Sequence, residues 1–353
     1  MVTKIQVIDN IELGGHKQGI YALQYSHGFM WSVGGDGYVV KWDINSGNGE
    51  LFAQIPEPIF CLKVVSEFAV LVGTQKGQVF LLEKGQQARA WKVSAQGIFF
   101  IEQVGEKFWV GLGDGRLMVF DQQFEVEKIM AITPNQESLR CVLLGPGIGL
   151  VERVDGLFGQ ERDLLDEESG QIGEGRVILD KQGDLQEAAS EAGPDSNSVW
   201  LGASDGCVYE VDSQSYEILS KRIANQPSVF SMDWDLTSTP AMISGGRDAQ
   251  LKRFDIQHQT ESVIPAHWYS IHQVKRHPQY ARFLASSSMD KSLKLWELPQ
   301  LDLIKVIDRP KIPMAHTHSV NALCWLPSES PKILKLASGS DDKRLVIWTL
   351  EIS

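Results

Sequence analysis

A phrase that occurs twice near the end of the chain constrains the fold more than any other feature, because a repeat implies a structure assembled from copies of one unit. Each copy begins with an alanine-histidine pair. A serine follows, then an aspartate four residues later and a tryptophan six residues after that. The two sets are His267, Ser286, Asp290 and Trp296, and His316, Ser338, Asp342 and Trp348.

The same spacing fits five further places along the chain, even where the residue types differ. It is complete in the first unit and loses members in the others. The positions are His16, Ser32, Asp36 and Trp42; Val72, Lys76 and Leu82; Val110, Asp114 and Phe120; Leu201, Asp205 and Val211; and Ser244, Asp248 and Phe254. Seven units therefore share one spacing.

Each unit has the composition of two strands joined by a tight turn. A serine-containing strand leads to a turn rich in glycine or aspartate, and a run of β-branched residues then ends in an aromatic residue. We therefore expect an all-β fold made of repeated hairpins.

The pattern resembles the WD-repeat family of β-propellers, whose unit is a four-stranded blade of about 40–45 residues. The resemblance implies a single propeller domain over residues 1–353 with seven blades. It also implies that the N-terminal segment closes the ring as the outer strand of the last blade, which removes an open sheet edge. We expect blade one to run to about Ile44 and blade two to about Glu83.

In the family, the histidine, serine, aspartate and tryptophan form a hydrogen-bonded tether inside each blade. The resemblance therefore implies structural roles for the residues of the three complete sets, and a partial tether at Ser244 and Asp248, where Asn225 replaces the histidine. The expected tether residues are His16, Ser32, Asp36, Trp42, Ser244, Asp248, His267, Ser286, Asp290, Trp296, His316, Ser338, Asp342 and Trp348.

The spacing fails once, between Asp114 and Asp205. Residues 146–198 contain 13 acidic and four basic side chains, which gives a balance of −9 within the chain's net charge of −12. This composition is poor in strand-forming residues. We expect an acidic insertion between the first and second strands of blade four, and an eighth, degenerate blade is the alternative.

Charge and cysteine content disfavour several classes of function, although a nucleic-acid-binding propeller with a local basic patch near Arg140 and Arg247 stays an alternative. A net charge of −12 and a pI near 5.2 oppose nucleic-acid binding, which depends on lysine and arginine. The four cysteines contain no C-x-x-C pair, so neither a zinc site nor a disulfide framework is indicated. A secretory signal and a membrane-spanning stretch are not recognisable, and we expect a cytoplasmic protein that does not bind membranes.

Motifs for catalysis and metal binding are weak. The G-x-S-x-G pattern at residues 202–206 falls on a predicted hairpin turn and not on the strand-to-helix turn that a nucleophile needs. The histidines have no accompanying cluster of acids or cysteines at ligand spacing. A calcium-loop pattern beginning at Asp180 has Leu185 where the sharp turn requires glycine. We expect no catalytic residue, metal or cofactor.

The candidate binding residues come from the resemblance, since propellers usually bind at the mouth of the central channel. The position after the first apolar residue of each innermost strand commonly faces that mouth. Aromatic residues and arginine, which are enriched in interface hot spots, occupy most of it. The residues are Tyr21, Phe60, Phe99, Arg140, Phe230, His272 and Asn321. The position before each tether acid adds Arg247, Met289 and Asp341.

These residues predict a non-enzymatic interaction scaffold that binds a protein or peptide at the channel mouth. Alternatively, the aromatic side chains at these positions pack between blades, since alternate residues of an inner strand are buried. The alternatives for the function are a propeller enzyme of the metal-dependent hydrolase type and a small-ligand binder in the channel. The acidic insertion is a second candidate surface, on the opposite face, or a solvated loop without a role.

Overall fold

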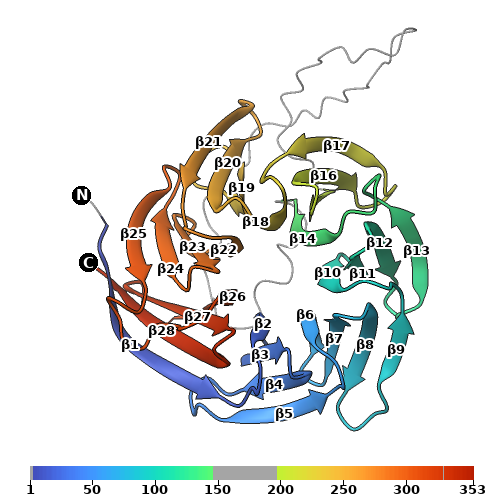
Figure 1. Cartoon of the computed structure of the whole chain (residues 1–353), viewed down its shortest axis with the longest axis horizontal. Helices are drawn as coiled ribbons and strands as arrows, with labels where there is room; N and C mark the ends of the chain where they lie inside the picture. The colour runs from blue at the N-terminus through green and yellow to red at the C-terminus, as the bar shows by residue number, and fades with distance from the viewer. Residues whose placement is uncertain (1–2, 146–196, 329) are drawn as a thin grey trace, which may run out of the picture.

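Seven antiparallel sheets of four strands stand around a central opening (Figure 1). The computed structural model describes residues 3–145, 197–328 and 330–353, and within these ranges the regular secondary structure consists of strands alone. The prediction of an all-β, seven-bladed propeller is confirmed. The predicted acidic insertion lies outside the described residues, except that Ser198 already belongs to a strand.

The blades follow one another along the chain. Blade one contains β2 (Ile20–Ser26), β3 (Phe29–Gly34), β4 (Tyr38–Trp42) and β5 (Gly49–Gln54). Blade two contains β6 (Ile59–Ser66), β7 (Ala69–Thr74), β8 (Gln78–Glu83) and β9 (Arg89–Lys92). Blade three contains β10 (Ile98–Val104), β11 (Lys107–Leu112), β12 (Arg116–Phe120) and β13 (Val126–Ala131). Blade four contains β14 (Leu139–Leu144), β15 (Ser198–Ala203), β16 (Cys207–Asp212) and β17 (Ile218–Ile223).

The last three blades complete the ring. Blade five contains β18 (Val229–Asp235), β19 (Ala241–Gly246), β20 (Gln250–Asp255) and β21 (Thr260–Pro265). Blade six contains β22 (Ile271–Arg276), β23 (Phe283–Ser288), β24 (Leu293–Glu297) and β25 (Asp302–Ile307). Blade seven contains β26 (Val320–Leu326), β27 (Ile333–Ser340), β28 (Arg344–Ile352) and β1 (Ile5–Gly14).

The N-terminal strand closes the ring, as predicted. β1 pairs antiparallel with β28, from Ile5 opposite Ile352 to Gly14 opposite Arg344. The innermost strands of blades three, four and five contact one another in turn, and β14 pairs with β15 in blade four. The ring therefore has seven blades, and the eight-blade alternative is wrong.

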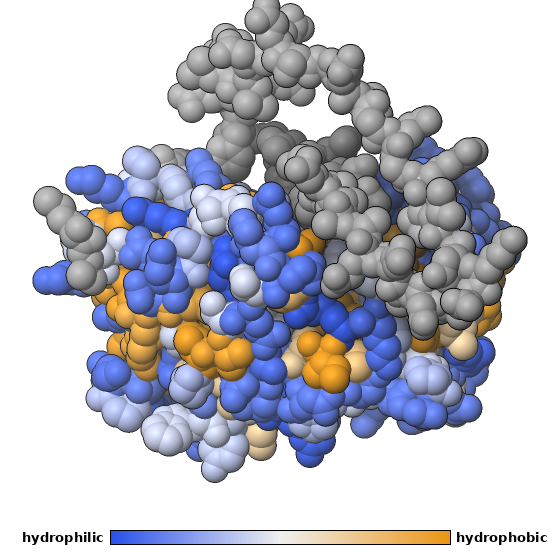
Figure 2. All heavy atoms as spheres, turned by 90° about the horizontal axis from the view of Figure 1, so that it is seen from above, coloured by the Kyte–Doolittle hydropathy of each residue, from blue (hydrophilic) through white to orange (hydrophobic). Residues whose placement is uncertain are grey.

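Blades one and two extend further in sequence than predicted. Blade one ends at Gln54 and blade two at Lys92, because a fourth strand follows the expected end of each. The outer strands are mostly solvent-exposed, so they lack the apolar pattern that marks the inner ones. Seen from the edge of the disc, hydrophobic side chains interrupt a mainly hydrophilic rim (Figure 2). Ile223, which is 63% exposed, is one of the apolar residues of these outer strands.

The core lies between the blades. The buried hydrophobic residues form seven clusters, and each joins two neighbouring blades. Between blades six and seven, for example, Phe283 and Leu295 meet Leu323 and Trp348. The second strand of each blade is buried almost along its whole length, since it is covered on both faces. Such strands have nearly continuous runs of apolar and small residues.

A buried histidine belongs to the interface between blades six and seven. His277 is 3% exposed, and its ring centroid lies 4.8 Å from that of Trp325 and 5.0 Å from that of Tyr280. Its Nδ1 accepts hydrogen bonds from the backbone N–H groups of Gln279 (3.2 Å) and Tyr280 (3.0 Å). Burial lowers the pKa of His277 to about 4, and the charge of Arg276 contributes to this. His277 is therefore a neutral packing residue at pH 7.

Candidate functional site

The predicted tether residues of blades one, six and seven are joined by hydrogen bonds. In blade one, the Trp42 indole N–H donates to Ser32 Oγ (2.8 Å), and His16 lies between Ser32 (Nε2 to Oγ, 2.8 Å) and Asp36 (Nδ1 to carboxylate, 3.1 Å). The corresponding serine–histidine distances are 2.7 Å in blade six and 2.8 Å in blade seven. The other bonds of these two blades join Trp296 to Ser286, His267 to Asp290, Trp348 to Ser338 and His316 to Asp342.

The partners determine which nitrogen of each tether histidine carries the proton. An ionised carboxylate can only accept, so Nδ1 donates to the aspartate. Nε2 then accepts from the serine hydroxyl, whose oxygen accepts from the tryptophan. Burial alone would raise the pKa of Asp290, but the hydrogen bond and charge of His267 bring it below its usual value. Burial lowers the pKa of His267. These histidines therefore serve the fold.

The remaining blades keep only part of this arrangement. In blade five, the Asn225 side-chain amide donates to Asp248 (2.9 Å), but within the described residues Ser244 has no side-chain hydrogen bond. Among the described residues no hydrogen bond joins Ser244 to Asn225, and the Phe254 ring has no N–H group to donate to it. In blade three, Ser94 donates to Asp114 from the position of the histidine (3.1 Å).

The seven predicted residues of the innermost strands occupy the same special backbone position. In every blade, the pairing between the first and second strands shifts by one residue, between Ile20 and Ala22 in blade one, for example. The shifts of the other blades span Phe60, Phe99, Arg140, Phe230, His272 and Asn321. A bulge of this kind leaves its extra residue unpaired and redirects the side chain. All seven of these residues therefore lie in bulges of the innermost strands.

The side chains at these positions contact one another around the ring. Ring centroids are 5.6 Å apart for Tyr21 and Phe60 and 5.7 Å apart for Phe60 and Phe99, whose rings are stacked. The Arg140 Cζ atom lies 4.0 Å from the Phe99 centroid and 5.7 Å from that of Phe230. All these side chains are half-buried.

Contacts through His272 and Asn321 connect Phe230 back to blade one. The centroids of Phe230 and His272 are 6.2 Å apart, and His272 Nδ1 lies 3.0 Å from Asn321 Oδ1. The Asn321 amide donates to the carbonyl of Ile20, next to Tyr21 (3.1 Å), and to Asp341 (2.8 Å). The seven residues therefore form one continuous belt.

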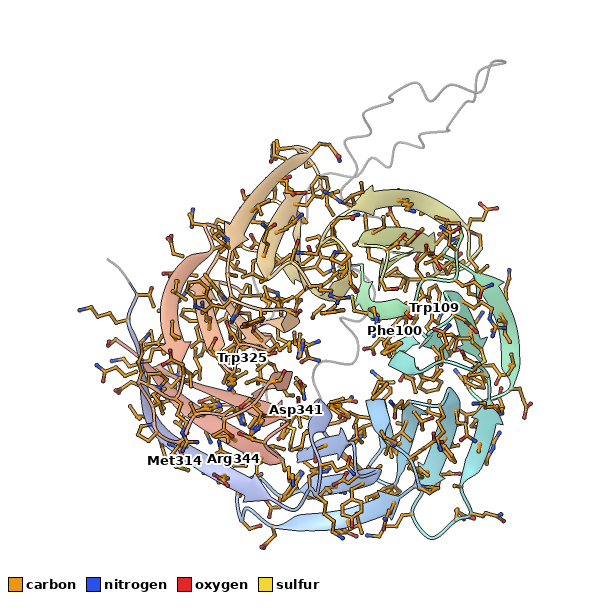
Figure 3. All side chains as sticks on the ribbon, in the orientation of Figure 1. Phe100, Trp109, Met314, Trp325, Asp341 and Arg344 are labelled. Carbon is orange, nitrogen blue, oxygen red and sulfur yellow. The ribbon has the colours of Figure 1, made fainter. Side chains whose placement is uncertain are left out.

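The belt differs in chemistry from one side to the other. Blades one to three contribute three aromatic rings, blades four and five contribute Arg140 and the exposed Arg247, and blade seven contributes Asp341. Asp341 lies at the inner end of blade seven beside the central opening, whereas Arg344 and Met314 of the same blade lie further out (Figure 3). The belt therefore has an aromatic, a cationic and an anionic sector.

An exposed apolar patch was not expected from the sequence. Trp268 is 87% exposed, Tyr269 61% and Met289 52%. The first two follow the tether histidine of blade six and lead into β22, so the patch lies on the mouth face. Only Met289 belonged to the predicted set. One feature of the sequence could have indicated this patch. Two aromatic residues follow the tether histidine His267, which fixes their backbone while their side chains lie outside the core.

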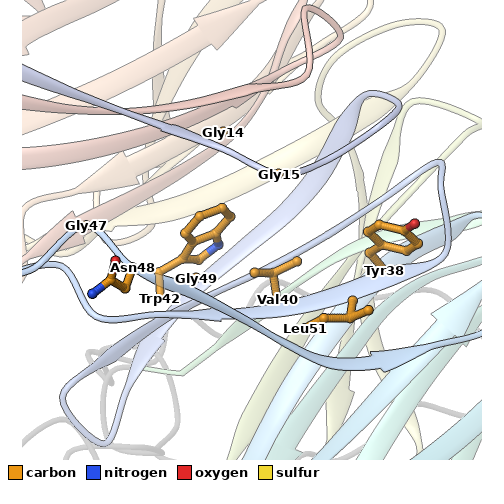
Figure 4. A pocket seen from close by; sticks show the side chains of 9 residues that line it. All are labelled: Gly14, Gly15, Tyr38, Val40, Trp42, Gly47, Asn48, Gly49 and Leu51. Atoms are coloured by element: carbon orange, nitrogen blue, oxygen red, sulfur yellow. The ribbon is translucent and has the colours of Figure 1, made fainter.

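Two pockets among the described residues lie away from the belt. One, of about 350 Å³, lies beside blade one, and its lining includes four glycines and Trp42 (Figure 4). The other, of about 460 Å³, lies between blades six and seven and includes Trp268 and Lys294. Among the described residues, no group of three or more histidine, cysteine, aspartate or glutamate side chains is arranged to hold a metal ion.

Two segments of the chain, residues 259–297 and 310–349, match the family model of the WD domain, G-beta repeat. This chain contains WD40 repeats. Each matched WD40 segment ends in a complete tether, and the first begins with β21 of blade five before it covers β22 to β24. One WD40 repeat thus spans parts of two blades, which explains why blade ends were predicted too early. No curated protein matches the chain.

WD40 propellers commonly serve as protein-interaction scaffolds, and their members are typically not enzymes. The part of the chain that the structure describes has no helix that is long and apolar enough to cross a membrane.

All four cysteines are free. Burial raises the pKa of the Cys324 thiol to about 11.

Proposed function

We propose that the protein is a non-enzymatic scaffold that binds a peptide segment of a partner protein across the channel mouth. The observation that carries the proposal is the belt of seven bulge residues, in which aromatic and arginine side chains remain half-buried on the innermost strands of the ring. A bulge costs ladder hydrogen bonds, and its presence in every blade at the mouth favours a functional position for these side chains.

The patch of blade six supports the same proposal. Trp268, Tyr269 and Met289 are large apolar residues that are more than half exposed, so burying them in this chain's core does not account for them. Aromatic residues and methionine are enriched at protein interfaces. A peptide that entered the mouth from blade six would cover the patch and then the aromatic sector of the belt.

The other functional classes receive less support. An enzyme of the metal-dependent hydrolase type would need several ionisable side chains facing one another in the channel mouth, where three of seven belt positions hold the aromatic rings of blades one to three. A nucleic-acid partner is disfavoured by the net charge of −12. The four free thiols favour a reducing compartment, and we propose a cytoplasmic location.

The proposal can be tested by binding of the full-length protein to an array of random 12-residue peptides. Wild type should retain a reproducible subset. Phe60→Ala in the belt and Tyr269→Ala in the patch should each reduce retention, because aromatic side chains at such positions contribute most to binding. Phe68→Ala is the matched control, since Phe68 is 61% exposed like Tyr269 but lies in the turn between β6 and β7, at the opposite end of the innermost strand.

The outcomes separate the alternatives. If Phe60→Ala and Tyr269→Ala reduce peptide retention and Phe68→Ala does not, the mouth face is supported as the binding surface. Equal loss with all three, or no retention by folded wild-type protein, refutes the proposal. The melting temperature of each variant must match that of wild type, because a loosened core would also reduce binding.

A further inference from the structure

Among the described residues, the cationic sector of the belt has no acidic side chain paired with it. Arg140 is the bulge residue of β14. Aromatic rings from the blades on both sides lie over its guanidinium group: the Phe99 ring centroid is 4.0 Å from the Arg140 Cζ atom, and the Phe230 centroid is 5.7 Å from it. Its Nε is buried without a hydrogen-bond partner. Within residues 3–145, 197–328 and 330–353, no carboxylate forms an ion pair with Arg140.

The surroundings make the missing partner costly. Burial lowers the pKa of Arg140, and the nearby charge of Arg247 lowers it further. An arginine remains charged nevertheless, because its ordinary pKa is above 12. A cation that is partly removed from water loses hydration, and only an anion or further hydrogen bonds restore it. Paired arginines elsewhere in the chain show the usual solution, such as Arg253 with Asp235 at 2.7 Å.

We propose that Arg140, with Arg247 beside it, is the receptor for a carboxylate of the bound peptide, an aspartate or glutamate side chain or the C-terminus. The planar guanidinium group matches a carboxylate with two parallel hydrogen bonds. Phe99 supports the guanidinium plane, so little side-chain entropy is lost when the anion binds. This inference rests on the proposed function, since it assigns the chemistry of the peptide that the mouth recognises.

The rest of the belt gives the peptide a direction. Asp341 is exposed in blade seven, three blades further round the ring from Arg140, and the Asn321 amide holds it at 2.8 Å. The aromatic sector of Tyr21, Phe60 and Phe99 lies next to Arg140. We therefore expect an apolar residue adjacent to the carboxylate in the retained sequences, with acidic residues excluded from the side that faces Asp341.

The test compares wild type with Arg140→Gln on the peptide array, which should also carry phosphoserine peptides. Wild type should retain sequences enriched in aspartate, glutamate or a free C-terminus. Arg140→Gln should bind those sequences at least about tenfold more weakly, since charge-assisted hydrogen bonds to the carboxylate are lost. Phosphoserine peptides retained in place of acidic ones, or an unchanged acidic preference in Arg140→Gln, would overturn the assignment.

Failure of this inference is distinguishable from failure of the proposed function. If Phe60→Ala abolishes retention while Arg140→Gln retains the same peptides, the mouth binds peptides but the carboxylate receptor is refuted. If wild type retains nothing, the proposed function fails as well.

A stability measurement gives an independent readout. Arg140→Met keeps an unbranched apolar stem against Phe99 and removes an unpaired charge, so the peptide-free variant should unfold at the same or a higher urea concentration than wild type. Arg253→Met is the matched control, and it should unfold at a lower concentration because it leaves the buried Asp235 carboxylate unpaired. A clear loss of stability in Arg140→Met would identify Arg140 as a structural residue and overturn the proposal.

Discussion

Removal of one hydroxyl group from the tether of blade seven should destabilise the propeller strongly. Ser338 is fully buried, and its Oγ lies 2.8 Å from both His316 Nε2 and Trp348 Nε1. Ser338→Ala leaves both nitrogens without a partner in a site from which water is excluded. Each unsatisfied group costs about 1–3 kcal/mol, so the loss of both partners should lower the free energy of unfolding by about 2–6 kcal/mol.

The same substitution in blade five is a matched control. Ser244 is 1% exposed and occupies the equivalent position, but its blade has Asn225 and Phe254 where blade seven has histidine and tryptophan. Ser244→Ala should therefore cost less than about 1 kcal/mol, because no polar partner is left unpaired.

Urea unfolding, followed by tryptophan fluorescence, measures the free energy of unfolding of both variants and of wild type. The comparison is valid if the slope of this free energy against urea concentration is the same in all three proteins. Trp348→Phe, alone and combined with Ser338→Ala, completes a double-mutant cycle. The reasoning is refuted if the two serine variants lose equal stability, or if the cycle shows no coupling between Ser338 and Trp348.

Three further predictions concern pH, backbone conformation and thiol reactivity. The pKa of His277 is lowered to about 4 from an ordinary value of 6.5, so the unfolded chain binds a proton that the folded protein does not; stability should fall as pH decreases from 6.5 towards 4, and urea midpoints of His277→Gln should change less over this range. Gly37→Ala should cost more than about 4 kcal/mol in chemical unfolding, because its Cβ would lie 2.1 Å from the Ile55 carbonyl, whereas Gly28→Ala, with a similar positive φ and open space, should cost only about 1–2 kcal/mol. The buried Cys61 thiol, whose pKa burial raises, should react with a thiol reagent only on unfolding, and fast labelling of the native protein would contradict this.

The sequence allowed the blade count and the complete tethers to be predicted because each depends on residues at fixed spacing. The positions of Asp36, Asp290 and Asp342 required only a repeat, and the structure gives each the expected histidine partner. Four-stranded blades were expected from the resemblance, but the ends of blades one and two were predicted too early. Solvent covers much of the surface of the fourth strands, so residues such as those of β13 carry no apolar periodicity.

The candidate site was only partly predictable. The seven mouth positions came from alignment of the blades, but the bulges that redirect their side chains depend on strand pairing and have no signature in residue type. The absence of an acidic partner for Arg140 in the described part of the chain is likewise a property of the folded ring. The exposed position of Trp268 was not predicted, because the residue type alone does not show whether an aromatic side chain next to a tether histidine is buried or exposed.

The pairing of β1 with β28 has a consequence for the order of folding. The ribosome makes β1 before every other strand and β28 after them, yet the two share nine residue pairs in one sheet. Joining them closes a loop of roughly 330 residues, at an entropic cost of about 5 kcal/mol. Until synthesis reaches β28, β1 remains an unpaired edge that other chains can join. Ring closure should therefore be the late, slow step of folding, and the nascent chain is most exposed to aggregation just before it.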